Sequence, residues 1–473
     1  MRTKQDTQAQ IEFQSPPGAR ATTEYFARYE WIGGLLDRHP EILRAVHRDL
    51  ERPIAQLRKR ASAGRPGKFT SDTVLRIVLV KLMENLSFRD AVIRIDDSTR
   101  LRAFTRLHND AMMDYSTLCQ LANAISPETW QAVNDMLAKT AVADGLITGE
   151  RLRLDTTAVE TNIHFPTDSH LLFDVHRVLS RLVRQVREIS PRLVTEKRLH
   201  DRAAKKLHTK IARIRGSKTE EKQKGQERRY RRLLKLVDGV LAWMPSLCDR
   251  IRRDGSRGAS TQFGAIALQG LADEIEHFRV LGLRAVEQAR RRVIDGENIP
   301  NDVKLFSIFE PHTELLIRGK AGKAIEFGHM VSIHQVSGSF ISEYRVHGKR
   351  PADHTTVDAA LERHEELFGA PPRVLAADKG YHESVQKTAQ LEKRVECVSI
   401  AKKGSRTERE QEREHSLAFR LAQKFRAGVE GSISYLKLCF GLSRCMNKGW
   451  KHFAATVGAT IFAHNLIVLA RSG

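Results

Sequence analysis

Apolar residues recur at helical spacing in several short segments that follow a polar start of the chain. Thr70 precedes the apolar run that begins at Val74, and Ser126 precedes Pro127 at the start of a later run. Ser and Thr are preferred caps before a helix, and Pro is favoured in its first turn. The pattern therefore predicts a compact helical domain over residues 70–148.

Two interpretations of this helical domain stay open. Short helices joined by tight turns are typical of a helix-turn-helix type DNA-binding domain, and the alternative is an ordinary helical packing domain. In the first interpretation, five arginines are available for DNA phosphates: Arg89, Arg94, Arg100, Arg102 and Arg106. Residues 1–69 are mostly polar and end in a basic segment with Gly and Pro, so we expect an N-terminal arm and linker there.

A strand pattern begins at residue 151 and predicts a short strand that carries Asp155 at its end. A helical pattern follows much later, at residues 356–368, and more helices are expected after residue 400. Further strand patterns occur at residues 303–309, 329–336, 340–346, 373–377 and 395–400. This order of elements describes an α/β domain, which we assign to residues 149–168 and 300–473.

Residues 169–299 separate the two parts of that domain and have a different pattern. Apolar residues there alternate in steps of three and four, from Val175 to Leu193 and from Leu233 to Ile251, which predicts a helical hairpin with coiled-coil seams. The seams pair within one chain or between two copies. A basic run over residues 218–235 is interpreted either as a solvated face or as a DNA-contacting arm.

The charge of the chain indicates a polyanionic partner. Lys and Arg number 79 against 57 Asp and Glu, a formal net charge of +22. Nucleic acid is the first hypothesis, because such a charge favours non-specific association with phosphates. Polar residues interrupt the apolar stretch at 453–470, so we expect a buried helix there and no membrane partner. The 5 cysteines include no Cys-x-x-Cys pair, which gives no sign of a zinc site.

One predicted helix near the C-terminus carries an acid between two bases. Arg426, Glu430 and Lys437 are spaced by four and seven residues, so they share one helix face. The simplest interpretation is a salt bridge between residues four apart, worth only about 0.2–0.5 kcal/mol on an exposed helix. Asp155 and Asp378 change this interpretation, because each stands at the end of a predicted strand. Three such carboxylates suit Mg²⁺ or Mn²⁺, and two of these ions are suited to phosphodiester chemistry.

The segments around these acids resemble those of bacterial insertion-sequence transposases of the DDE superfamily, over nearly the full length of the chain. The shared segments are Leu154-Asp155-Thr156-Thr157, Ala377-Asp378-Lys379-Gly380-Tyr381, and a helix with Arg, three residues, Glu, six residues and Lys. The family has a Tyr three residues before that Arg, where this chain has Gln423.

The resemblance implies an RNase H-like mixed sheet with a helical N-terminal domain, and a helical insertion, the coiled-coil hairpin, after the first catalytic strand. It implies that Asp155, Asp378 and Glu430 are catalytic and hold two Mg²⁺ or Mn²⁺ ions. Water would attack at the ends of the insertion sequence, and the freed 3′-hydroxyl would then attack target DNA. Arg426 and Lys437 would bind DNA phosphates at those ends.

The resemblance also implies double-stranded DNA as a partner, with terminal inverted repeats recognised by the helical domain. We further expect a second copy of the chain in the DNA complex, because of the coiled-coil seams and the need to hold two DNA ends together. We expect a cytoplasmic, nucleoid-associated protein. Two alternative functions are an RNase H-like DNA nuclease without strand transfer, and a non-catalytic DNA-binding protein derived from a transposase.

Overall fold

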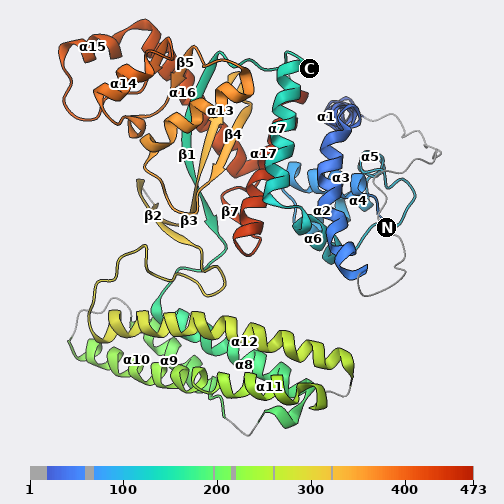
Figure 1. The fold of residues 1–473 in the computed structure, drawn as a ribbon, viewed down its shortest axis with the longest axis vertical. Coiled ribbons are helices and arrows are strands. Elements are labelled where there is room, and N and C mark those ends of the chain that lie inside the picture. Colours follow the sequence, from blue (N-terminus) through green and yellow to red (C-terminus); the bar gives the residue numbers. More distant parts are fainter. Residues whose placement is uncertain are drawn as a thin grey trace. The chain divides into compact units, whose positions relative to one another are not determined.

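The computed structural model describes residues 19–58, 69–194, 198–214, 220–258, 261–320 and 323–471. They fold into two compact units (Figure 1). The first unit combines residues up to 161 with residues 329–473, and the second comprises residues 162–328. The chain leaves the first unit after residue 161, at the end of one strand, and re-enters it at residue 329, within another strand of the same sheet.

Helices form the N-terminal part of the first unit. They are α1 (Arg20–Arg38), α2 (Pro40–Arg58), α3 (Ser71–Met83), α4 (Phe88–Asp96), α5 (Thr99–Phe104), α6 (Tyr115–Ala124) and α7 (Pro127–Ala143). The Thr70 hydroxyl accepts a hydrogen bond of 3.1 Å from the Thr73 amide. Ser126 accepts one of 3.2 Å from Thr129, with Pro127 in the first turn. Both predicted helix starts are confirmed.

Residues 20–58, expected to belong to a polar arm, instead form α1 and α2. Their aromatic residues explain the difference, because they are part of the core. Tyr29 is buried and packs edge-on against Phe104 of α5, with ring centroids 4.9 Å apart. The basic segment expected at residues 61–68 lies outside the described residues.

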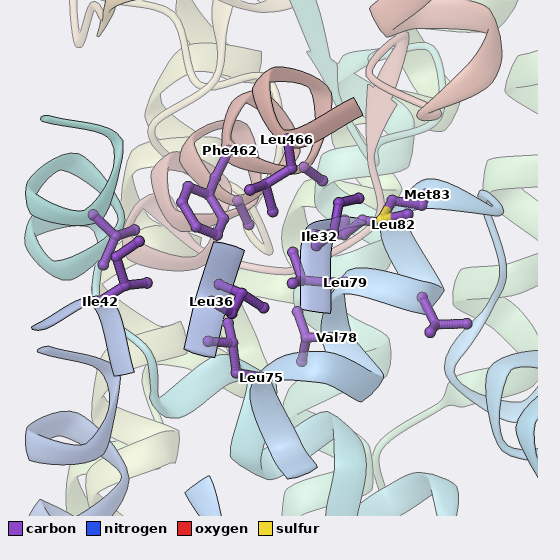
Figure 2. Close-up of a cluster of buried hydrophobic side chains, with 14 of the residues drawn as sticks. Ile32, Leu36, Ile42, Leu75, Val78, Leu79, Leu82, Met83, Phe462 and Leu466 are labelled. Atoms are coloured by element: carbon purple, nitrogen blue, oxygen red, sulfur yellow. The ribbon is translucent and has the colours of Figure 1, made fainter. Parts of the chain in front are cut away.

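The core of this helical part includes the last helix of the chain, α17 (Trp450–Ala470). Figure 2 shows Phe462 and Leu466 of α17 among Leu36 of α1 and Leu75 and Leu79 of α3. By length and composition α17 could cross a membrane, yet 89% of its apolar window is buried inside the protein. Packing within the unit explains its apolar sequence.

A mixed sheet forms the rest of the first unit. Its strands are β1 (Arg151–Thr161), the second half of β3 (Lys323–Gln335), β4 (Ile341–Val346), β5 (Val374–Ala376), β6 (Cys397–Ser399) and β7 (Arg444–Cys445). The order is β4-β3-β1-β5-β6, and β7 pairs with the end of β1. β3 and β4 are antiparallel, whereas β1, β5 and β6 are parallel.

Helices cover both faces of this sheet (Figure 1). Leu152 and Leu154 of β1 share a buried cluster with Leu361 of α13 (Val357–Phe368). Val159 of β1 instead clusters with Val429 of α16 (Leu417–Cys439). Because strand side chains alternate between faces, odd-numbered positions of β1 face α16 and even-numbered positions face α13. Two short helices, α14 (Val385–Leu391) and α15 (Glu408–His415), connect these elements.

One predicted strand is wrong. Residues 303–309 form no strand, although Leu305 and Ile308 are buried in the core of the second unit. Gln288 forms the backbone hydrogen bonds of Leu305 that a neighbouring strand would otherwise form. Its side chain accepts a hydrogen bond of 2.7 Å from the Leu305 amide and donates one of 3.2 Å to the Leu305 carbonyl. Strand β2 (Glu314–Lys320), which follows, and strand β7 were not predicted.

Helices also form most of the second unit: α8 (Asp168–Ile189), α9 (Asp201–Ile214), α10 (Glu220–Leu241), α11 (Met244–Gly258) and α12 (Gln262–Ala289). The second predicted seam is divided, because α10 ends at Leu241 and α11 starts at Met244. Both seams are buried in the core of this bundle. They therefore pair within the chain, which is the intramolecular alternative. Residues 215–219, in and beside the basic run, lie outside the described residues.

Buried ion pairs link the N-terminal helices. The Arg76 side chain is 3% exposed, and it donates hydrogen bonds of 2.8 Å to Asp72 and 2.7 Å to Asp37. A further bond of 3.4 Å runs from Arg76 to the carbonyl of Phe104. Arg76 thereby joins α3 to α1 and α5, and it compensates the charge of the buried Asp72 together with Arg106, whose Nε lies 3.2 Å from Asp72 Oδ2.

We predict that Arg76→Ala destabilises the protein by about 3 kcal/mol, because it leaves the buried Asp72 with only the partly exposed Arg106 as a counter-charge. Urea unfolding monitored by circular dichroism measures the change. Arg20→Ala is the control, since the Arg20 side chain is 93% exposed in its pair with Glu24. It should change stability by at most about 1 kcal/mol. Equal effects of the two substitutions would contradict a structural role for the buried pair.

Candidate functional site

The register between β1 and β5 places two acids at one edge of the sheet. The last paired positions are Arg153 and Ala376. Asp155 and Asp378 each follow their paired residue by two positions, in parallel strands. Neighbouring strands lie about 4.8 Å apart, so the two residues are neighbours where β5 has ended and β1 continues. Asp155 is half-exposed within a stretch of β1 that is otherwise buried from residue 152 to residue 159.

Local backbone bonds orient both carboxylates. Oδ1 of Asp155 accepts a hydrogen bond of 2.7 Å from the amide of Thr156. Oδ1 of Asp378 accepts one of 2.6 Å from the amide of Gly380, and so caps the short 3-10 helix Lys379–Tyr381. Short polar side chains commonly cap the following turn in this way. Both acids therefore accept a hydrogen bond from the backbone within two residues of their own position.

Tyr381 is a buried residue at the centre of this region. Its side chain is hydrogen-bonded to Thr156, the residue after Asp155. Burial first, and then the negative charges of Asp353, Asp155 and Asp378, raise the pKa of Tyr381 well above its usual value of 10.0. The phenol therefore stays protonated at neutral pH, among three carboxylates.

Glu430 lies on α16, on an exposed part of the helix. Its carboxylate Oε1 accepts a hydrogen bond of 2.9 Å from Nη2 of Arg426, and its side chain is 64% exposed. The predicted salt bridge is therefore formed. Lys437 is half-buried two turns later on the same helix, and its backbone carbonyl accepts a bond of 3.2 Å from the Ser443 hydroxyl.

Gln423 anchors α16 to the same edge of the sheet. Its Nε2 donates hydrogen bonds to the carbonyl of Ala377 at 3.2 Å and to the carbonyl and hydroxyl of Ser399 at 2.7 and 3.0 Å. Ala377 immediately precedes Asp378. This position, where the sequence departs from the family pattern, therefore has a structural role, and the side chain is directed toward the ends of β5 and β6.

A buried arginine fixes the next turn of α16. Arg153 of β1 donates from Nη1 to the carbonyl of Phe425 at 2.5 Å and from Nε to Gln335 of β3 at 2.7 Å. Its burial lowers the pKa to about 10. A Cβ atom at Gly428 would lie 2.2 Å from Arg153 Nη1, so only glycine allows this close approach. Arg153 thus holds β1, β3 and α16 together, two residues before Asp155.

The structure brings Asp155 and Asp378 together, and leaves Glu430 paired with Arg426 on the surface of α16. Within the described ranges, no group of three or more His, Cys, Asp or Glu residues is arranged to hold a metal ion. The donor chemistry nevertheless fits a hard divalent cation, because the acids at this edge offer carboxylate oxygens. The sequence alone does not single out Asp353, since an Asp just before a helix is an ordinary capping residue.

The arginines proposed for phosphate contact in the N-terminal helices are engaged within the protein. Arg94 pairs with Glu84, Arg102 with Asp96, and Arg106 with Asp37. The remaining two lie over aromatic rings, Arg89 over Tyr115 and Arg100 over Phe26. These contacts favour the packing interpretation for the five side chains.

A separate cleft of about 740 Å³ lies on the α13 face of the sheet, between α7, β4 and α13. Its lining includes Asp135, Glu343, Glu362 and Glu366, with Arg345 and Arg363 as counter-charges. Arg363 is itself paired with Asp135, Glu343 and Glu366. So many carboxylates disfavour DNA phosphates, and the edge that carries Asp155 and Asp378 remains the candidate site.

Two protein-family models match the sequence. Residues 35–124 match the model described as "Transposase domain (DUF772)", and residues 290–466 match "Transposase DDE domain". The second segment includes Asp378 and Glu430, whereas Asp155 lies in neither. No curated protein and no solved structure matches the chain. The two matched segments together cover more than half of the chain, and the DDE model implies an RNase H-like fold. The protein therefore belongs to the DDE transposases of insertion sequences, enzymes that cleave DNA and transfer its strands with divalent metal ions.

Proposed function

We propose that this transposase hydrolyses the phosphodiester at the terminal inverted repeats of its insertion sequence, and that the freed 3′-hydroxyl then attacks target DNA. The register between β1 and β5 carries the proposal, because it makes Asp155 and Asp378 neighbours at one edge of the sheet. Gln423 connects α16, the helix of Glu430, to that same edge.

Asp155, Asp378 and Glu430 are proposed to hold two Mg²⁺ or Mn²⁺ ions. When bound, such ions activate the attacking hydroxyl and stabilise the leaving oxygen. Without a bound metal, Glu430 pairs with Arg426, and such exposed pairs contribute at most about 1 kcal/mol to stability. The carboxylate can therefore exchange Arg426 for another partner at little cost. The buried side of α16, fixed by Gln423 and Arg153, keeps the helix in place during that exchange.

Arg426 and Lys437 are proposed to bind phosphates at the DNA ends. A guanidinium offers paired donors that match phosphate oxygens, and Arg426 becomes available for them when Glu430 takes its catalytic role. Both residues lie on α16 with Glu430. The acid and the phosphate contacts are thus set by one helix.

The wider assignments rest on fold and charge. The strand order β4-β3-β1-β5-β6, with β3 and β4 antiparallel and the others parallel, supports an RNase H-like catalytic sheet. In residues 162–328, Lys and Arg outnumber Asp and Glu by 34 to 21, which supports DNA contact by the helical insertion. We propose that residues 70–148 recognise the terminal repeats, that two copies hold two DNA ends, and that the protein associates with the bacterial nucleoid.

We predict that Glu430→Gln lowers DNA cleavage and joining by at least about 100-fold while DNA binding persists, because the neutral amide cannot replace a carboxylate that acts in the transition state. A gel assay with labelled terminal-repeat DNA, target DNA and Mg²⁺ measures all three activities. Glu412→Gln, at an exposed position of α15, is the control and should behave as wild type.

The same assay separates the alternative functions. Cleavage without joining by the wild type would indicate a nuclease, and binding alone would indicate a non-catalytic DNA-binding protein. Full joining activity in Glu430→Gln would refute the assigned site.

We predict that Arg426→Ala weakens binding of terminal-repeat DNA and reduces the slope of log K against log salt by about 1, the effect of one lost phosphate contact. Fluorescence anisotropy over a range of salt concentrations measures both quantities. Arg420→Ala, on an exposed position of the first turn of α16, is the matched control for a change of net charge. Identical slopes for the two variants would argue against a specific phosphate contact by Arg426.

A further inference from the structure

A third aspartate approaches the pair at the edge of the sheet. Asp353 begins the short 3-10 helix Asp353–Thr356 that precedes α13. Its Oδ1 accepts a hydrogen bond of 3.2 Å from the hydroxyl of Thr156, the residue next to Asp155. Asp353 therefore reaches β1 from a segment almost 200 residues away in the sequence, at the position where the candidate site lies.

Gly380 shows how close Asp353 comes to Asp378. A Cβ atom at Gly380 would lie 2.7 Å from Asp378 Oδ1 and 3.1 Å from Asp353 Oδ2. The two oxygens are therefore separated by at most 5.8 Å, the sum of these distances. The space between them stays open only because residue 380 has no side chain.

We infer that Asp353 is a further carboxylate ligand of the divalent metal site, where it acts together with Asp378. The inference rests on the proposed function, since it assigns a fourth acid to the same site. It goes beyond the three acids that the sequence motifs of the chain indicate.

The charges around Asp353 support a ligand role over a purely structural one. Among the described residues, Asp353 and Asp378 accept hydrogen bonds from neutral donors, the Thr156 hydroxyl and the Gly380 amide, and neither forms an ion pair within 4.0 Å. Two carboxylates this close repel each other. A divalent cation between them removes the repulsion and uses oxygens that Mg²⁺ and Mn²⁺ prefer.

Asp353 approaches the metal site from a different face of the sheet than Glu430. Thr156 is an even-numbered position of β1 and faces α13, whereas Asp155 faces α16. Asp353 therefore supplies a carboxylate from the α13 face, and Glu430 is carried by the helix on the other face. Burial of Tyr381 among Asp353, Asp155 and Asp378 is consistent with this convergence.

The test measures metal binding directly. Isothermal titration of the full-length protein with Mn²⁺, in the absence of DNA, is compared for wild type, Asp353→Asn, Asp378→Asn and the control Glu362→Gln, an exposed residue of α13. We expect Asp353→Asn and Asp378→Asn each to weaken Mn²⁺ binding at least about 10-fold, with Glu362→Gln unchanged. Asparagine keeps an oxygen that can accept the Thr156 hydrogen bond, so the Tm without metal should not fall.

The outcomes separate the inference from the function on which it depends. Weaker binding in Asp378→Asn with wild-type binding in Asp353→Asn would overturn the inference and leave the proposed site intact. Wild-type binding in both variants would refute the proposed metal site itself. A lower Tm in Asp353→Asn with unchanged Mn²⁺ affinity would make Asp353 a structural cap and would also overturn the inference.

A second variant tests the same space while keeping every carboxylate. Gly380→Ala would place a methyl group between Asp353 and Asp378. We expect it to weaken Mn²⁺ binding as Asp353→Asn does. Wild-type affinity in Gly380→Ala would mean that no cation occupies the space between the two acids.

Discussion

The parallel pairing of β1 with β5 is the interaction on which the candidate site depends. β5 is only three residues long, and its register with β1 decides which residue of β1 stands beside Asp378. A shift by one residue would place Asp155 on the opposite face of the sheet, because side chains alternate along a strand. Arg153 and Gln423 protect this register, since both connect the paired strands to α16 through buried or half-buried hydrogen bonds.

The acids at this edge require positive charge from elsewhere. The five arginines first considered in the N-terminal helices pair with carboxylates or lie over aromatic rings of the first unit. Much of the excess lies in residues 162–328, with 34 basic against 21 acidic residues. A basic insertion and an acidic edge are compatible with the proposed function, in which the first would attract the DNA backbone over a long range and the second would hold metal ions at one phosphate.

The sequence was most informative where local patterns decide the structure. Helix caps at Thr70 and Ser126, and the strand that ends just before Asp378, depend on residues within a few positions of one another, and the structure contains them as expected. The strand at Asp155 is also present, but it continues to Thr161, so Asp155 lies in its middle and not at its end as predicted. Asp353 could not be found in this way, because its significance comes from a contact with Thr156 across the fold. The segment at 303–309 has a strand-like pattern, yet Gln288 satisfies its backbone, and no local pattern signals such a partner. Likewise, the polar composition of residues 1–69 concealed the few aromatic residues that bury α1 in the core.

Helix α17 connects the two cores of the first unit. One side of it, including Phe462 and Leu466, packs with the N-terminal helices, and another, including Phe453 and Ile461, packs with the sheet. Asn465 adds two hydrogen bonds to the backbone of Ile341 at the start of β4, of 2.8 and 3.0 Å. A helix that is apolar on nearly all sides is thus required by its position between two cores. The segment that matches the DUF772 transposase domain and the sheet that carries the acids therefore share one continuous packing arrangement within the first unit.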